Sequence, residues 1–177
     1  MKTIETERLI LRGWTLDDLD DYHEFGKNPK VGPMVGWAPH ESKAFSLNAL
    51  KYLIENDDAW SIVLKENSKV IGYLRVFPDE NHGKLYTKSI SYAISPEYWN
   101  KGYMTEAVKR GIKYAFDEMN IDLMTVWHNP DNIQTKRVIE KCGFNYAATI
   151  EQGYKNYNGQ IFDSVYYELL KSDYYNA

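Results

Sequence analysis

The clearest chemical signal lies where an apolar strand passes into the helix that follows it. Residues 90–107 (ISYAISPEYWNKGYMTEA) combine a strand-like stretch that ends at Ile94 with a helical pattern that begins near Tyr103. Such a helix start presents backbone N–H groups and the positive end of its dipole beyond the strand, which favours an anion such as a phosphate. Gly102 would let a phosphate approach the backbone, and Thr105 adds a hydroxyl. Alternatively, Gly102 merely permits the turn and Thr105 is an ordinary first-turn residue.

A second polar pair stands at the start of a later helix, predicted from about Asn132 to Lys141 and ended by Gly143. Helical spacing places Thr135 one turn after Asn132, at the head of an apolar stripe that is predicted to point inward. The pair either binds a ligand or serves as a helix cap and a core hydroxyl. Asn132 can do both.

The elements that position these residues follow from hydrophobic periodicity and turn residues. Strands are predicted over Ile4–Arg12, Trp60–Lys65, Val70–Phe77, Leu85–Ile94, Leu123–Trp127, Tyr146–Tyr157 and Ile161–Leu170. Helices are predicted after the N-cap Thr15 and over Glu41–Glu55, Tyr103–Met119 and Asn132–Lys141, with a loop over Asn28–Pro39. This order predicts a mixed α/β (α+β) fold, in which the strands on either side of the Tyr103 helix are parallel. We expect one domain over residues 1–177.

Composition narrows the classes of function. The 177 residues are 44% apolar and 15% aromatic, which is enough for a buried core. The chain has 21 basic and 25 acidic residues, for a net charge of −4, so we expect no nucleic-acid partner. No apolar run is long enough to cross a bilayer and the N-terminus does not resemble a signal peptide, so we expect a cytoplasmic protein with no membrane partner. The single cysteine excludes an internal disulfide, and the four histidines show no metal-ligand spacing, so no metal is expected.

Together these segments resemble the GNAT superfamily of acyl-CoA-dependent N-acyltransferases, in its branch of RimJ/RimL-like ribosomal-protein acetyltransferases. The resemblance covers almost the whole chain. It implies a central twisted mixed sheet of about seven strands with flanking helices, splayed between the fourth and fifth strands, which end at Ile94 and Trp127. The pantetheine arm of acetyl-CoA, the co-substrate, would lie in that gap. The matching segments are Glu5–Arg12 as opening strand, Tyr98–Ala107 as pyrophosphate loop, Asn132–Thr135 with Glu140–Phe144 as second cofactor motif, and Asn158-Gly159, Asp163 and Tyr166 in the closing hairpin.

The resemblance also implies roles for individual residues. The Ala93 backbone N–H would stabilise the oxyanion, and the Thr135 hydroxyl would protonate or orient the leaving thiolate, unless it is simply a core hydroxyl. On the acceptor side we expect Trp37 and Ser89, although Trp37 alternatively pins its loop to the core. The expected cofactor-binding residues are Ile94 and Asn132 for the pantetheine arm, and Lys101, Gly102, Tyr103, Met104 and Thr105 for the pyrophosphate.

Four positions depart from the family pattern. Asn100 replaces a usual glycine and Met104 a usual small residue, while Ser89 stands where many relatives carry a glutamate. The tyrosine that many other members use as an acid aligns with Ile139. These departures leave the identity of any side-chain acid or base open.

The expected reaction is transfer of an acetyl group to a primary amine, by direct attack in a ternary complex. An α-amine, with a pKa of about 7.7–8.0, needs less help from a base than a lysine at about 10.4. The missing glutamate therefore favours a protein N-terminus as acceptor. One alternative is that the acceptor is a small amine such as a polyamine or aminoglycoside. Another is that the protein is a non-catalytic acyl-CoA sensor. The sequence is also compatible with a homodimer.

Overall fold

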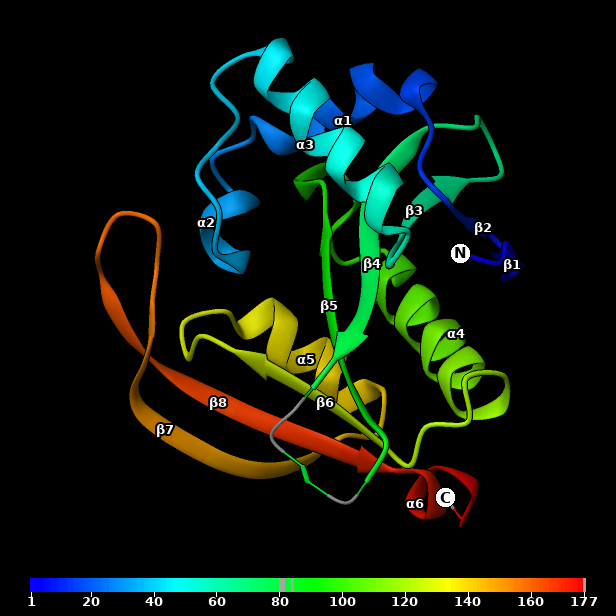
Figure 1. The fold of residues 1–177 in the computed structure, drawn as a ribbon, viewed down its shortest axis with the longest axis vertical. Coiled ribbons are helices and arrows are strands. Elements are labelled where there is room, and N and C mark those ends of the chain that lie inside the picture. The colour runs from blue at the N-terminus through cyan, green and yellow to red at the C-terminus, as the bar shows by residue number, and fades with distance from the viewer. Residues whose placement is uncertain (80–81, 84, 177) are drawn as a thin grey trace. The chain divides into compact units, whose positions relative to one another are not determined.

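The computed structural model describes residues 1–79, 82–83 and 85–176. The strands are β1 (Ile4–Glu5), β2 (Leu9–Arg12), β3 (Ala59–Leu64), β4 (Val70–Pro78), β5 (Thr87–Ile94), β6 (Leu123–His128), β7 (Asn145–Lys155) and β8 (Ile161–Leu170). The α-helices are α1 (Leu19–Gly26), α2 (Gly32–Val35), α3 (Lys43–Asn56), α4 (Tyr103–Asp117), α5 (Ile133–Lys141) and α6 (Lys171–Asn176). Hydrogen bonds join the strands in the order β1-β2-β3-β4-β5-β6-β8-β7 (Figure 1). Because β5 and β6 are parallel while β6 and β8 are antiparallel, the predicted mixed sheet is confirmed.

The chain forms two compact units, and each is built from two segments. The first unit comprises Met1–Arg75 and Tyr92–Arg110, and the second comprises Val76–Ser91 and Gly111–Ala177. Strands β4 and β5 and helix α4 each begin in one unit and end in the other. The single domain expected over residues 1–177 stays a prediction.

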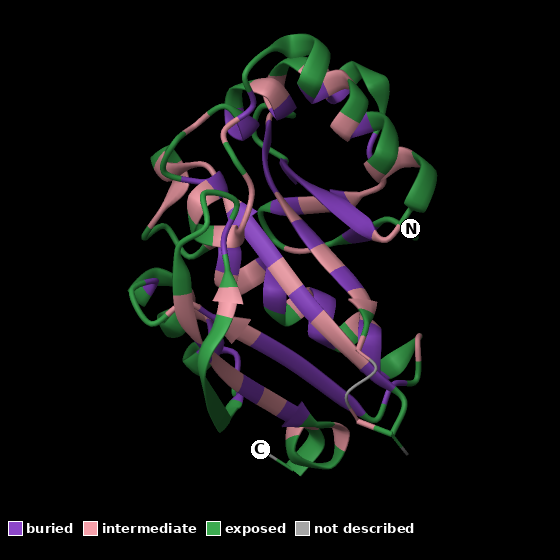
Figure 2. Ribbon diagram, turned by 60° about the vertical axis from the view of Figure 1, so that its left-hand side comes forward, coloured by how far each residue is buried: buried purple, intermediate pink, exposed green. Residues whose placement is uncertain are grey.

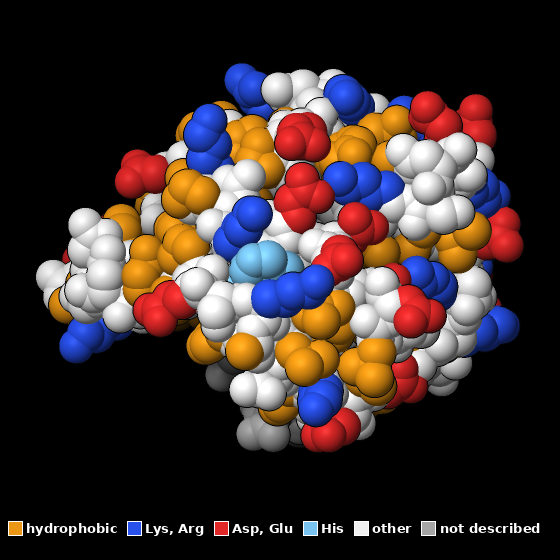
Figure 3. All heavy atoms as spheres, turned by 90° about the horizontal axis from the view of Figure 1, so that it is seen from above, with side chains coloured by type: hydrophobic (Ala, Val, Ile, Leu, Met, Phe, Trp, Pro, Cys, Tyr) orange, Lys and Arg blue, Asp and Glu red, His pale blue; other side chains and the backbone are white. Residues whose placement is uncertain are grey.

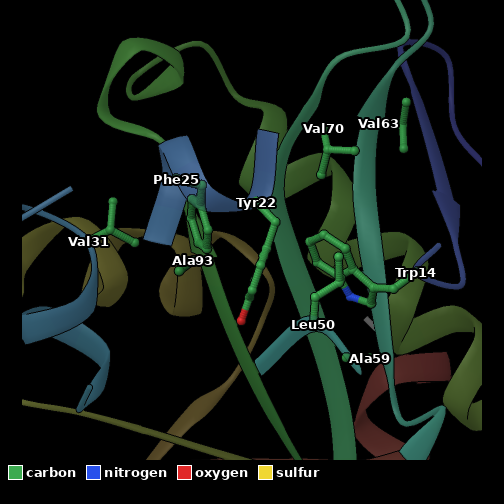
Figure 4. Packing of buried hydrophobic residues seen from close by; sticks show 9 residues of the cluster. All are labelled: Trp14, Tyr22, Phe25, Val31, Leu50, Ala59, Val63, Val70 and Ala93. Carbon is green, nitrogen blue, oxygen red and sulfur yellow. The ribbon is translucent and has the colours of Figure 1, made fainter. Parts of the chain in front are cut away.

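The first unit has its hydrophobic core around β3, every residue of which is buried (Figure 2). Helix α1 contributes Tyr22 and Phe25, three residues apart and hence on one face. The ring of Tyr22 meets that of Trp14 edge to face, with centroids 5.0 Å apart. These contacts fix α1 and α3 over the sheet. The buried cluster consists of Trp14, Tyr22, Phe25, Val31, Leu50, Ala59, Val63, Val70 and Ala93 (Figure 4).

The N-terminal segment does not form the single predicted strand. The backbone N–H of Thr6 donates to Leu9 O (3.0 Å), and its hydroxyl oxygen accepts from the N–H of Leu9 (2.9 Å). The chain therefore turns back on itself, with Glu5 opposite Ile10 in an antiparallel hairpin. Since a threonine that bonds the nearby backbone leaves the hydrophobic alternation unchanged, the pattern alone does not reveal the turn. The sheet consequently has eight strands, where about seven were expected.

The other elements differ from their predicted boundaries by less than the N-terminal segment does. The expected loop over Asn28–Pro39 contains the short helix α2, which ends at Gly36 with a φ of 106°. Helix α3 begins two residues later than predicted because the Ser42 hydroxyl caps it, accepting from the N–H of Phe45 (3.1 Å). The short C-terminal helix α6 was not predicted.

The second unit is built on the antiparallel pair β6 and β8, which are in register from Leu123 opposite Leu170 to His128 opposite Val165. The parallel ladder between β5 and β6 ends at Ser89 opposite Thr125, three residues before β6 ends. This early end lies where the sequence predicts the two strands to splay.

Charged side chains of both signs are interspersed on the face over α1 and α3 (Figure 3). Lys43 of α3 pairs with Asp20 of α1, and Lys69 pairs with Glu24 of α1. This mixture is typical of a solvated surface. Within the described residues, no helix has the length and apolar character to span a membrane.

Candidate active site

The junction of β5 and α4 has a backbone shape suited to a phosphate group. Asn100 and Gly102 have φ angles of 60° and 82°, both in the left-handed region. The carbonyl of Gly102 accepts the hydrogen bond from the N–H of Glu106 (3.0 Å), so the amides before Glu106 precede the helical ladder at its positive end. Asparagine adopts left-handed angles more readily than most other side-chain-bearing residues, so Asn100 suits this position.

Two residues far apart in sequence hold this junction in place. Arg8 donates from Nη1 to Lys101 O (3.0 Å) and from Nε to Glu106 Oε2 (2.7 Å), and its guanidinium lies 4.3 Å from the centre of the Tyr103 ring. Glu106 Oε1 also accepts from the Thr6 hydroxyl (2.5 Å) and from the backbone N–H of Arg8 (3.0 Å). We call Thr6, Arg8 and Glu106 the loop brace. Because Arg8 and Glu106 are 98 residues apart, no local sequence pattern predicts their contact, and the sequence analysis missed it.

The brace keeps Glu106 ionised. Burial by itself would raise the pKa of this carboxyl, but the hydrogen bonds from Thr6 and Arg8, together with the positive charge of Arg8, hold it below its usual value. An ionised Glu106 in the first turn is also favourable to the helix dipole of α4.

Ala93 and Ile94 end β5 against β4. A Cβ atom on Gly72 of β4 would lie 2.2 Å from the carbonyl oxygen of Ala93, so only glycine allows this close approach. The indole N–H of Trp99 donates to the carbonyl of Ile94 (2.9 Å) and fixes the start of the loop. The oxyanion role of Ala93 and the pantetheine contact of Ile94 stay predictions.

The remaining loop residues differ in burial. The Met104 side chain is buried, so the bulky residue at this position packs into the interior. Tyr103 and Thr105 are half-buried, whereas Lys101 and Gly102 are exposed. Their expected contacts with the pyrophosphate stay predictions.

Asn132 caps α5 by accepting a hydrogen bond from the N–H of Thr135 at its side-chain oxygen (3.1 Å). The cap interpretation is therefore confirmed. Ile139 is fully buried and Thr135 is half-buried, as expected for the inward face of the helix. Neither the pantetheine contact of Asn132 nor the catalytic role of Thr135 is tested by this geometry.

Trp37 lies in an aromatic cluster of the first unit. Its ring centre is 6.0 Å from that of Phe25 and 5.7 Å from that of Tyr73. These contacts are the ones that a tryptophan pinning its loop to the core would make. Its place on the acceptor side stays a prediction.

Ser89 belongs to a chain of hydrogen bonds that ends at a buried carboxylate. Its hydroxyl oxygen is 2.6 Å from the hydroxyl oxygen of Thr125, which in turn donates to Asp79 Oδ2 (2.6 Å). Asp79 directly follows β4, and its side chain is only 5% exposed. Sequence reasoning missed Asp79 because it lies between two predicted strands, Val70–Phe77 and Leu85–Ile94, and belongs to neither.

A histidine and a second carboxylate complete this group. His82 Nδ1 is 3.6 Å from Asp79 Oδ2, and its Nε2 is 3.8 Å from Glu168 Oε2. Thr125 is opposite both Ser89 on β5 and Glu168 on β8, so the side chains follow one line across the sheet. We call Asp79, His82, Ser89, Thr125 and Glu168 the polar row.

Aromatic rings lie beside the polar row in the second unit. Trp127 is two residues after Thr125 and so shares its face of the sheet. Its ring centre is 4.9 Å from that of Tyr154 and 6.3 Å from that of Tyr166. Burial and the charge of Asp79 raise the pKa of Tyr166, which keeps this phenol neutral. We call Trp127, Tyr154 and Tyr166 the aromatic group.

Carboxylates next to aromatic faces suit a cation, because ring faces attract positive charge. A metal ion would need a different arrangement. In the part of the chain that the structure describes, no three His, Cys, Asp or Glu side chains are placed to hold one.

Comparison with known proteins identifies the family. The family model described as the Acetyltransferase (GNAT) domain matches residues 8–145, well over half of the chain. The chain belongs to the GNAT family. This GNAT protein is therefore an N-acetyltransferase with acetyl-CoA as its co-substrate. The match begins at Arg8 of the loop brace and includes the junction of β5 and α4.

Individual relatives agree with this assignment. This GNAT chain is 26% identical to the uncharacterized N-acetyltransferase p20 of Bacillus licheniformis, over 98% of its own length and 99% of the relative's. A solved GNAT-family acetyltransferase from Bacillus anthracis superposes with a TM-score of 0.86 at 23% identity, covering 97% and 99% of the two chains.

Two further solved structures share the fold. One is the ribosomal-protein-S5-alanine acetyltransferase of Vibrio fischeri, with a TM-score of 0.80 at 19% identity over 98% and 99% of the chains. The other is the spermidine N-acetyltransferase of Vibrio cholerae in complex with CoA and spermine, with a TM-score of 0.79 at 21% identity over 97% and 100%.

Proposed function

We propose that this GNAT acetyltransferase moves the acetyl group of acetyl-CoA onto a small primary amine that is protonated in solution. The amine attacks the thioester directly in a ternary complex. The observation that supports this acceptor is the polar row beside the aromatic group, where Asp79 and Glu168 supply negative charge next to three aromatic rings. The net charge of −4 adds a weak general attraction for cations.

On the co-substrate side, the amides from Lys101 to Thr105 would hold the pyrophosphate, since they lie at the positive end of α4. Ile94 and Asn132 would contact the pantetheine arm. The Ala93 N–H would stabilise the developing oxyanion, and the Thr135 hydroxyl would orient the leaving thiolate. The thioester is already activated, so positioning supplies much of the rate.

The acceptor expected from the sequence was a peptide α-amine, because Ser89 replaces a glutamate. The contact of Ser89 with Thr125 and Asp79 weakens that argument, since hydrogen bonds connect this serine to a carboxylate. A strongly basic amine therefore becomes the better acceptor. The two solved acyltransferases with different named substrates share this fold equally well, so the fold favours neither acceptor.

The test is a panel of acceptors at pH 7.5 with acetyl-CoA, in which the released CoA thiol is measured. Spermidine, an aminoglycoside and several N-terminal peptides represent the three classes. We expect kcat/KM for the best small amine to exceed that of every peptide by at least about tenfold, which is a difference of about 1.4 kcal/mol in transition-state stabilisation.

A faster reaction with any peptide would reverse the assignment in favour of the α-amine. Binding of acetyl-CoA without turnover of any amine would instead indicate an acyl-CoA sensor.

A further inference from the structure

The hydroxyl hydrogens of Ser89 and Thr125 in the polar row have one favoured direction of donation. An ionised carboxylate only accepts hydrogen bonds, so Thr125 donates its one hydroxyl hydrogen to Asp79 over 2.6 Å. The equally short contact between Ser89 and Thr125 then has Ser89 as its donor. Donation therefore runs from Ser89 to Thr125 to Asp79, because the 2.6 Å contact of Ser89 with Thr125 is much shorter than its alternative 3.3 Å contact with Asp79.

This direction determines what Ser89 offers to a ligand. Its only hydroxyl hydrogen is directed at Thr125, so its oxygen presents lone pairs to the next group. The complementary group is a donor such as the N–H of an ammonium ion. Ser89 is half-buried, whereas the side chain of Asp79 is only 5% exposed and is connected to Ser89 by the short bonds through Thr125.

We propose that the chain Ser89–Thr125–Asp79 carries the proton of the acceptor ammonium to Asp79. This inference rests on the proposed function, because it requires a protonated amine as acceptor. Ser89 contacts the amine, Thr125 connects the two ends, and Asp79 is the terminal proton acceptor. A glutamate at position 89 would do the same in one step.

The step balances as follows. One ammonium N–H bond breaks and its proton passes to the oxygen of Ser89, while the hydroxyl protons of Ser89 and Thr125 each move one place, to Thr125 and Asp79. The nitrogen lone pair forms the C–N bond to the acetyl carbon as the C–S bond breaks. A second nitrogen proton passes to the thiolate sulfur. The products are the N-acetyl amine, CoA with its thiol, and Asp79 as the carboxylic acid.

His82 provides the way back to the ionised state. Its Nδ1 is 3.6 Å from Asp79 Oδ2 and, within the described residues, this buried nitrogen has no hydrogen-bond partner. The ring as a whole is 34% exposed, and its other nitrogen is 3.8 Å from Glu168. His82 therefore places a partly exposed imidazole between the buried carboxylate of Asp79 and solvent.

The test is the pH dependence of kcat/KM for the best small amine in Asp79→Asn. Without its terminal acceptor the variant can use only the free amine, which is about one part in a thousand at pH 7.4 for an amine with a pKa of about 10.4. We expect kcat/KM of the variant to rise about tenfold with each pH unit up to the pKa of the amine, so that its loss relative to the wild type is greatest at pH 7.4 and shrinks toward pH 10. Among the described residues, the titratable groups beside Asp79 are His82 from its own loop and Tyr166 from β8, and Glu168 of β8 lies beside His82.

A second variant keeps the test informative if Asp79→Asn does not fold. Ser89→Ala leaves the bond between Thr125 and Asp79 intact, interrupts the chain at its first member and should show the same pH-dependent loss. The matched control is Asp122→Asn, the same substitution at an exposed carboxylate of the same unit, which accepts from the N–H of Tyr86 (2.9 Å). Its pH profile should match that of the wild type.

A small amine whose pKa lies well below 7 provides a further readout, since it needs no proton acceptor. With this amine, Asp79→Asn and Ser89→Ala should react within about threefold of the wild type, because the amine is already unprotonated at neutral pH. A loss that is equal at every pH and for both kinds of amine would mean a structural role and would overturn the proton chain while leaving the transferase function in place. A wild type that acetylates no amine would overturn the proposed function itself.

Discussion

Replacing Glu106 with glutamine should loosen the junction of β5 and α4, because this carboxylate is the centre of the loop brace. It accepts from the hydroxyl of Thr6 and from the backbone and side chain of Arg8. A glutamine keeps one oxygen, which can still serve Thr6 and the Arg8 backbone. Its amide NH2 group, however, would face the guanidinium, so the charge-assisted contacts of Arg8 are lost.

The size of the effect follows from the exposure of the pair. An exposed ion pair contributes about 0.2–1 kcal/mol, whereas breaking a buried one costs about 3–5 kcal/mol. The Glu106 side chain is 19% exposed and that of Arg8 is 41% exposed, so the pair lies between these limits. We expect Glu106→Gln to lower the free energy of unfolding by about 2 kcal/mol, or Tm by about 4–8 °C for a chain of this size.

The effect should depend on pH with a defined sign. The pKa of Glu106 is lower in the folded protein than its ordinary value of 4.5, so its stabilisation is fully present above pH 4.5. It is lost as the pH falls through the folded-state pKa. The gap in unfolding free energy between wild type and Glu106→Gln should therefore be constant from pH 7 to pH 6 and narrow below pH 4.5.

The assay is urea unfolding of both proteins across this pH range, with calorimetric titration of CoA at pH 7. The control is Glu140→Gln, which removes one partner of the exposed pair with Lys136 (3.9 Å) and should change stability by less than about 0.5 kcal/mol. Because Arg8 also holds Lys101 O, CoA should bind Glu106→Gln about fivefold more weakly, or about 1 kcal/mol. Equal unfolding free energies at pH 7, or a gap that persists below the folded-state pKa, would refute the reasoning.

Two further predictions concern the co-substrate. Acetyl-CoA at a hundredfold excess over its Kd should stabilise the wild type by about 2.7 kcal/mol. Gly102→Val should lose most of this gain, because the φ of 82° at residue 102 disfavours a side chain and the phosphate needs the space. An undiminished melting shift in the variant would mean that the pyrophosphate binds elsewhere. Thr135→Val keeps the shape of the side chain but removes its hydroxyl, so turnover should fall at least about tenfold with the Kd of acetyl-CoA unchanged. Equal turnover in the two proteins would mean that the role of Thr135 is purely structural.

The sequence predicts the parts of the fold that depend on local pattern. The helix from Tyr103 and the strand from Ile161 begin where periodicity places them, and Asn132 caps α5 as expected. The Asn158-Gly159 turn between β7 and β8 is also confirmed, with Gly159 at a φ of 87°. Each of these signals is contained within a few residues, so neighbouring residues are sufficient to read it.

The contacts that organise the site are long-range, which is why the pattern does not reveal them. The Thr6 hydroxyl both makes a local turn and reaches a helix 100 residues later, and nothing in the alternation of residues 4–12 distinguishes this from a continuous strand. Asp79 sits in a polar segment that is ordinary for a turn. Its importance appears only when β4, β5 and β6 align it with Ser89 and Thr125.

Position 89 shows how the chemistry of a site can be kept while its usual residue is replaced. In isolation, serine instead of glutamate implies that no base is present, and that inference led to a weakly basic acceptor. A serine, however, is small enough to leave room for a second hydroxyl, and Thr125 is held opposite it by the parallel ladder of β5 and β6. The carboxylate then need not lie on β5 at all, provided that a neighbouring strand supplies one at hydrogen-bonding distance from Thr125, as Asp79 does. If the proposed proton chain is correct, the strength of the acceptor amine as a base is determined by the pairing of strands and not by residue 89 alone.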